Sequence, residues 1–174
     1  MTVASDATAR PAESLTFAVR AIARTAGVEI GHAALNDALG YLPPALGGDA
    51  GSMHGRDARL VEAGKSFGMQ IRAVHPPEAS RGLEDVPEFE QHFDLSYRPL
   101  ILRALENGQY VLAWRGWAGE RELSWGWIRA ACEEGVRFRG ATIWTEAELE
   151  ALRDDLLTRP AIQLYIVERI GSRI

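Results

Sequence analysis

The chain contains little of what several large classes of protein require. It has one cysteine, Cys132, so no disulfide can form within the chain, and a reducing compartment such as the cytoplasm is favoured. It has one lysine, Lys65, among 19 basic residues. It has no apolar run near the roughly 20 residues that a membrane-spanning helix needs. We therefore expect a soluble, cytoplasmic protein that does not insert into a membrane.

A concentrated positive charge is missing as well. The formal net charge is −5 and the isoelectric point is about 5.4. Binding to nucleic acid depends on a cationic surface that displaces counterions from phosphates. The charge balance therefore argues against a nucleic-acid partner.

What is present has the composition of one folded domain. Apolar residues make up 47% of the 174 residues and charged residues 25%, which is typical of globular proteins. A chain of this length is expected to form a single sizeable core. Residues 1–13 are polar and predict a flexible N-terminal arm, and residues 14–174 predict one domain without an internal repeat or linker.

The first half of the chain is mainly helical in pattern. Apolar residues recur at helical spacing in 15–26, 34–39 and 56–67, and a glycine follows each stretch. Ser14 stands just before the first of these helices, in the position of an N-cap. Residues 41–55 are rich in glycine and proline and predict a long surface loop.

The second half is mainly extended. Strands are predicted at 69–75 and 110–114, then a hairpin of 123–132 and 136–142, and a last strand at 161–170 that offers a free edge. Two helices interrupt them. One covers about 93–107, where Pro99 limits its start to near Tyr97 or kinks it, and the other covers 146–157 with a Thr145–Glu148 capping box. This order predicts an α+β fold with helices packed on a mostly antiparallel sheet.

The tryptophan-rich second half carries a resemblance to a known family. A helix is followed by NGQYVLAW and then by a hairpin that contains WGWI. The corresponding residues are Gly108, Val111, Leu112 and Trp114, then Trp125, Gly126 and Ile128. From Ser14 to Trp144 the chain resembles the papain-like cysteine peptidases that trim double-glycine leader peptides, and the related N-terminal domain of butirosin biosynthesis protein H. The resemblance implies a papain-like fold.

The same resemblance implies that the catalytic groups have been replaced. The family's cysteine, at the start of the first helix, falls on Ser14, and its histidine falls on Ser124. Its aspartate or asparagine falls near Ala131, Cys132 or Glu133. A serine hydroxyl needs a base to accept its proton, and a second serine cannot serve as one. We expect Ser14 to cap the helix and Cys132 to be a small buried residue.

The leading hypothesis is accordingly a catalytically inactive domain. It would be a binding or assembly module for a peptide, a small ligand or a partner protein, and it could form oligomers. The alternative is a hydrolase or acyltransferase in which Ser14 or Thr16 is the nucleophile and His54 is the base. No cofactor is expected.

Two groups of residues are candidates to line a binding cleft. Trp125 and Trp127 share one face of a strand, and Trp114 and Trp117 end the preceding strand and begin its loop, so the indoles could form the wall of a groove. The ordinary alternative is that they belong to the core. A third hypothesis is that the chain is a subunit of a larger complex, for which an exposed Trp117 region and the edge of the last strand are the candidate contacts.

His54 and Asp57 form the second group, at the point where the glycine-rich loop enters a helix. The alternative there is an exposed histidine and an aspartate that stabilises the helix N-terminus. The other histidines are His32, expected at the surface or as a cap, His75 and His92. None shares metal-ligand spacing with another histidine or with the cysteine, so no metal site is predicted.

Overall fold

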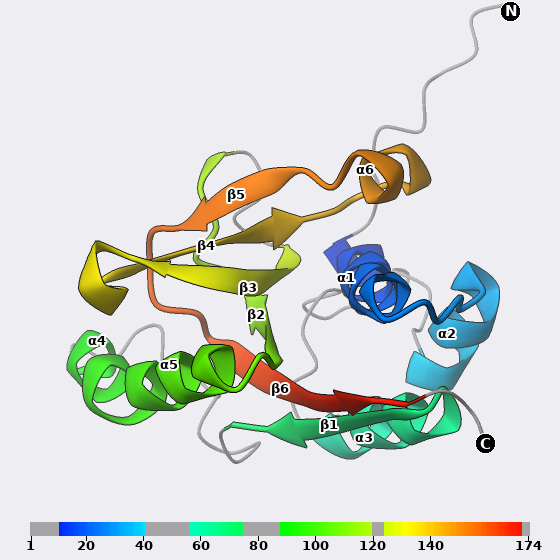
Figure 1. Ribbon diagram of the computed structural model, residues 1–174, viewed down its shortest axis with the longest axis horizontal. Helices are drawn as coiled ribbons and strands as arrows, with labels where there is room; N and C mark the ends of the chain where they lie inside the picture. Colours follow the sequence, from blue (N-terminus) through cyan, green and yellow to red (C-terminus); the bar gives the residue numbers. More distant parts are fainter. Residues whose placement is uncertain (1–10, 41–55, 75–87, 120–123, 172–174) are drawn as a thin grey trace, which may run out of the picture.

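The sheet organises the chain. The computed structural model describes residues 11–40, 56–74, 88–119 and 124–171, and the statements below concern those residues. In this part of the chain six strands form one sheet in the order β1-β6-β2-β3-β4-β5, and every neighbouring pair is antiparallel (Figure 1). The strands are β1 Met69–Ala73, β2 Tyr110–Trp114, β3 Trp125–Cys132, β4 Arg137–Thr142, β5 Asp154–Leu157 and β6 Gln163–Ile170. The predicted α+β class and the antiparallel sheet are confirmed.

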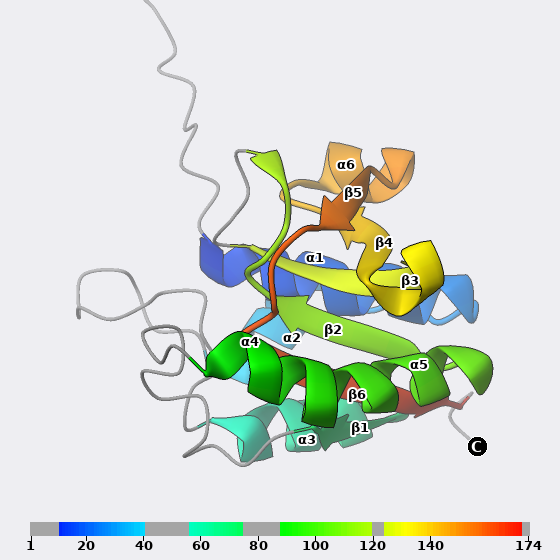
Figure 2. The same cartoon turned by 90° about the vertical axis from the view of Figure 1, so that its left-hand side faces the viewer.

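Helices lie on both faces of this sheet. They are α1 Pro11–Thr25, α2 His32–Leu39, α3 Asp57–Ser66, α4 Phe89–His92, α5 Arg98–Glu106 and α6 Glu146–Ala151. Figures 1 and 2 show α1 on one side of the sheet and α4 with α5 on the other. Period-two alternation in β2 serves both layers, since Leu112 and Trp114 join the core under α1 whereas Val111 and Ala113 join the core under α5.

The ends of α1 and α6 differ from the sequence prediction. Because α1 begins at Pro11, residues 11–13 belong to the helix rather than to an arm, and Ser14 lies inside the first helical turn instead of capping it. At α6 the predicted cap is confirmed, since the Glu148 N–H donates to Thr145 Oγ1 at 3.2 Å. The helix nevertheless ends at Ala151, because Leu152 adopts a left-handed conformation with φ 48°. Residues 154–157, predicted as helix, form the edge strand β5.

Pro99 affects the helical segment formed by α4 and α5. The chain is helical from Phe89 to Glu106, but Phe93–Tyr97 forms a π-helical turn between α4 and α5. Proline has no N–H to donate to the carbonyl four residues earlier, and a π turn is one way in which a helix absorbs such a defect. The helical chain starts at Phe89, so the predicted start near Tyr97 is wrong, and the irregularity expected there as the alternative is the π turn.

The last strand does not lie at an edge. β6 pairs with β1 on one side and with β2 on the other, so its hydrogen-bonding groups are used in both directions. The prediction that the terminal strand offers a free edge for a partner is therefore wrong. In the described sheet the two edges are β1 and β5.

Candidate functional site

Ser14 and the start of β3 meet in the core. The backbone N–H of Trp125 donates a hydrogen bond to Ser14 Oγ at 2.9 Å across 111 residues of sequence. Ser14, Ser124 and Trp125 all have 0% exposed surface. The two positions that the family resemblance assigns to a nucleophile and a base are thus adjacent, at the N-terminal part of α1 and the beginning of β3.

This arrangement holds Ser14 as a structural group. Its oxygen accepts a bond from a backbone amide, and an amide N–H is not a base that could remove the hydroxyl proton. The bond also satisfies a buried N–H that would otherwise cost free energy. Because Ser14 lies inside α1, its predicted role as an N-cap is wrong, and its side chain connects the helix to the sheet.

Thr16 belongs to a second, partly buried network that sequence reasoning missed. Its hydroxyl donates to Asn36 Oδ1, and Asn36 Nδ2 lies 3.1 Å from His32 Nε2. Since the Asn36 oxygen is the acceptor for Thr16, its amide nitrogen is the donor to His32 Nε2. The hydroxyl proton of Thr16 therefore rests on an amide oxygen, which does not activate a nucleophile.

His32 is held rather than exposed. Its ring is half-buried and lies 4.7 Å from the ring of Phe17, measured between centroids. Its Nδ1 is buried and has no hydrogen-bond partner in the described part of the chain. The spacing of His32 and Asn36, four residues apart on one helix, was the available signal for this contact. The expected capping role of His32 is wrong, because Gly31 is the N-cap of α2, and its ring is half-buried rather than exposed.

Three of the four candidate tryptophans gather on one face of the sheet. The ring centroids of Trp114 and Trp125 are 5.5 Å apart, and those of Trp125 and Tyr165 are 5.7 Å apart. Trp127 joins the same core, and all of these rings have at most 1% exposed surface. The indoles fill the space between α1 and the sheet, as their ordinary interpretation as core residues predicts.

Trp117 lies on the opposite face. It is fully buried, and its Nε1 donates to the Ala113 carbonyl at 3.1 Å. Its ring rests on Gly126 and Gly140, where a Cβ atom would approach it to 2.7 Å and 2.4 Å. The predictions of an exposed Trp117 region and of its convergence with the other indoles are therefore wrong. Two glycines in neighbouring strands provide the room for the ring.

Asp57 is connected to the Ser14 region through aromatic side chains. It begins α3, and the Tyr165 hydroxyl donates to its Oδ1 at 2.5 Å. Its Oδ2 is buried without a hydrogen-bond partner among the described residues. Tyr165 in turn packs on the ring of Trp125, and the backbone N–H of Trp125 donates to Ser14. His54, the other member of this candidate pair, lies in 41–55, outside the described residues.

Cys132 does not approach this region. It is half-buried at the end of β3, whereas Trp125 begins the same strand. Eight residues of strand separate the two ends by about 23 Å at the usual rise per residue. Cys132 therefore cannot take part in chemistry at Ser14.

Among the described residues, the pKa shifts that the structure causes lie in two other places. Burial raises the pKa of the Tyr97 hydroxyl, in the π turn between α4 and α5. A hydrogen bond from Arg137 lowers the pKa of the Glu133 carboxyl, at the tip of the β3–β4 hairpin. Neither group lines the space between α1 and β3, so these shifts do not prepare an acid or a base beside Ser14.

The chain was compared with family models, with curated proteins and with solved structures. No match was found in any of the three. The papain-like interpretation therefore stays a proposal that depends on the motifs and on the site.

Two further findings concern the described ranges. They contain no group of three or more histidine, cysteine, aspartate or glutamate side chains placed to hold a metal ion. Their helices also include none with the length and apolar character that crossing a bilayer requires.

Proposed function

We propose that this chain is a catalytically inactive, papain-like domain that acts as a binding or assembly module. The observation that carries the proposal is the bond from the Trp125 N–H to Ser14 Oγ. The family resemblance assigns Ser14 and Ser124 to the places of nucleophile and base, and these positions are neighbours in space. The same contact holds the Ser14 oxygen in the core, where it serves stability instead of catalysis.

The burial of the site favours a partner protein over a ligand held beside Ser14. Ser14, Thr16, Ser124 and Trp125 all have 0% exposed surface. A substrate group cannot reach a hydroxyl that is covered on all sides. The framework would therefore present its outer surface to another protein.

The outer surface has one apolar pair that fits such a role. Among the described residues, Leu95 is 72% exposed and Val136 is 63% exposed. Arg98 lies between their segments, since its Nη1 donates to the Val136 carbonyl at 2.7 Å and its Nη2 to Asp94 Oδ1 at 2.5 Å. Arginine is enriched at protein contacts, so we take Arg98 and the two exposed apolar side chains as the surface that a partner protein would cover.

The catalytic part of the proposal is tested by hydrolysis of a panel of peptides, esters and amides. The wild type, Ser14→Ala and Thr16→Val should all give the uncatalysed rate. A wild-type rate that falls at least about a hundredfold in either variant, with folding kept by circular dichroism, would overturn the proposal. His54→Ala belongs in the same panel, because the alternative hydrolase or acyltransferase uses His54 as the base for Ser14 or Thr16.

The binding part is tested by crosslinking the tagged chain in cells of its host. Leu95→Asp combined with Val136→Asp should abolish the crosslinked partner, and Ala147→Asp on the exposed surface of α6 is the matched control. A partner that crosslinks equally to all three proteins would place the contact elsewhere.

A further inference from the structure

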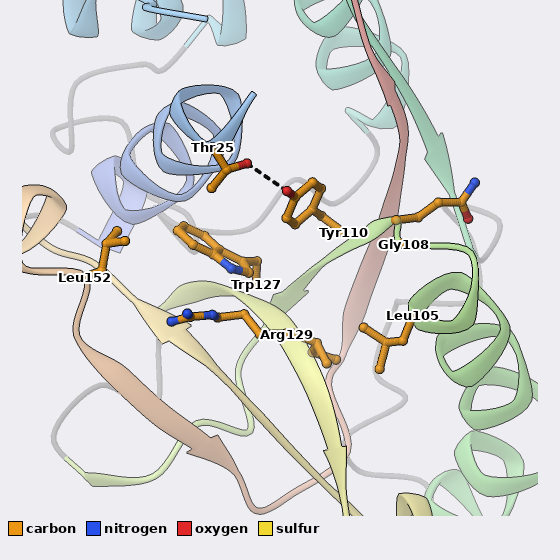
Figure 3. A pocket seen from close by; sticks show the side chains of 9 residues that line it. Thr25, Leu105, Gly108, Tyr110, Trp127, Arg129 and Leu152 are labelled. Carbon is orange, nitrogen blue, oxygen red and sulfur yellow. Dashed lines mark hydrogen bonds between the residues drawn. The ribbon is translucent and has the colours of Figure 1, made fainter. Parts of the chain in front are cut away.

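A cavity lies at the end of α1 that is remote from Ser14. It has a volume of about 310 Å³ and is open on one side. Figure 3 shows side chains around it from α1, the end of α5, β2 and β3, among them Thr25, Tyr110, Trp127 and Arg129. This volume is near the lower limit for small-molecule sites in proteins. Every residue that lines it belongs to the described part of the chain.

The cavity exists because α1 is shorter than the sheet face that it covers. The helix ends at Thr25, and Gly27 with φ 74° turns the chain away. Beyond that point Tyr110 opens β2, and Arg129 follows Ile128, the residue that pairs with Val111. The register between β3 and β4 shifts between Ile128 and Ala130, so Arg129 is the extra residue of a β-bulge. Bulges commonly redirect a side chain toward a site.

The Tyr110 hydroxyl is the donor in its hydrogen bond with Thr25, which leaves its oxygen available as an acceptor. Thr25 Oγ1 donates its single proton to the Ile22 carbonyl at 2.6 Å. In the 2.8 Å contact between Thr25 Oγ1 and the Tyr110 hydroxyl, Tyr110 must therefore be the donor. Its proton is used, and its oxygen keeps lone pairs for another group. This end of the cavity offers an acceptor, and the nearby C-terminus of α1 adds partial negative charge.

Arg129 places a positive charge and hydrogen-bond donors at the other end of the cavity. Its Nη1 donates to Asp154 Oδ1 at 2.5 Å, and the two side chains are 43% and 58% exposed. A guanidinium carries five N–H donors, so this bond leaves most of them available. An exposed ion pair of this kind contributes little free energy, and an incoming carboxylate can share the arginine with Asp154. Between the two ends, the lining by Trp127, Leu105 and Leu152 is apolar.

We propose that this cavity binds a small carboxylate with an apolar body and a hydroxyl or amino group. Arg129 pairs with the carboxylate, the apolar lining covers the body, and the Tyr110 oxygen accepts the donor of the ligand. The site is separate from Ser14 and does not depend on the proposed function of the domain.

The test is a titration of the purified full chain followed by nitrogen–proton correlation NMR, with the Trp127 indole N–H as reporter. The probe is 4-hydroxybenzoate, compared with benzoate and with the neutral 4-hydroxybenzamide. A ligand of about ten non-hydrogen atoms should bind with a Kd on the order of 1 mM. The charged probe should shift the indole signal saturably, and the neutral amide should bind at least about tenfold more weakly.

Three variants locate the binding. Arg129→Gln should weaken 4-hydroxybenzoate about tenfold, whereas Arg139→Gln, an exposed arginine on β4 that does not line the cavity, should leave the affinity unchanged. Tyr110→Phe should weaken 4-hydroxybenzoate and leave benzoate unchanged. The proposal is overturned by the absence of a saturable shift up to about 20 mM, well above the expected Kd. It is overturned equally by unchanged binding in Arg129→Gln.

Discussion

The backbone N–H of Trp125 donates to Ser14 Oγ at 2.9 Å, and this bond joins the first helix to the start of β3. Both residues are fully buried. A buried donor that loses its acceptor costs about 1–3 kcal/mol, and this contact therefore contributes to the stability of the fold.

Ser14→Ala should lower the free energy of unfolding by about 1–2 kcal/mol, because the Trp125 N–H loses its partner and the better helix propensity of alanine offsets part of the loss. Urea unfolding followed by circular dichroism measures the change. Ser66→Ala is the matched control, since Ser66 is an exposed serine near the end of α3. Equal stability of the two variants would show that the Ser14 bond is dispensable.

The Thr16–Asn36–His32 network should behave as one unit. Thr16→Val removes the donor to Asn36, and Asn36→Ala removes the acceptor, so each change alone should cost about 1–2 kcal/mol. In the double variant the second change should cost little, because its partner is already gone. A double-mutant cycle by urea unfolding measures the coupling, and strictly additive losses would argue against the network.

Close packing of Trp117 on two glycines makes them intolerant of a side chain. A Cβ atom at Gly140 would lie 2.2 Å from the Trp127 carbonyl oxygen and 2.4 Å from the Trp117 ring. Gly140→Ala should therefore cost more than about 3 kcal/mol or prevent folding. Gly171→Ala is the control, because the nearest atom there is 3.8 Å away. Thermal unfolding compares them, and a stable Gly140→Ala protein would contradict the observed position of Trp117.

The Glu133 carboxyl should titrate below its ordinary range because Arg137 donates to it across the β3–β4 turn. A carboxyl whose pKa falls on folding contributes stability above its unfolded pKa, and that stability is lost as the pH falls through the folded pKa. Arg137→Gln should return the pKa of the Glu133 carboxyl toward its ordinary range. Carbon-detected NMR titration of the carboxyl measures this shift, and an unchanged pKa in the variant would contradict the assigned cause.

The strands and most helices were predictable because their signals are local. Alternation in β1, the continuous apolar run of β2, the hairpin of β3 and β4, and the glycines after α1, α2 and α3 all act within a few residues. β5 was missed because Asp154–Leu157 continues the apolar pattern of α6, and only the left-handed Leu152 separates the two elements. No local pattern reports that a leucine will adopt φ 48°.

The candidate site was predictable to a smaller extent. The family resemblance placed Ser14 and Ser124 at the positions of the nucleophile and the base. The two lie close together, since Ser14 accepts a hydrogen bond from Trp125, the residue after Ser124. Trp117 lies on the face of the sheet opposite the other indoles, and this position depends on Gly126 and Gly140 in β3 and β4. The Thr16–Asn36 bond likewise depends on how α1 packs against α2. Such contacts are set by tertiary packing, which spacing along one chain does not encode.

The most direct test of the central claim is labelling of the intact protein with a fluorophosphonate, which modifies serine only when a base activates its hydroxyl. Mass spectrometry should find no added phosphonyl group on either the wild type or the Ser14→Ala variant. Stoichiometric labelling of the wild type that disappears in Ser14→Ala would show that Ser14 is an active nucleophile and would contradict a catalytically inactive domain.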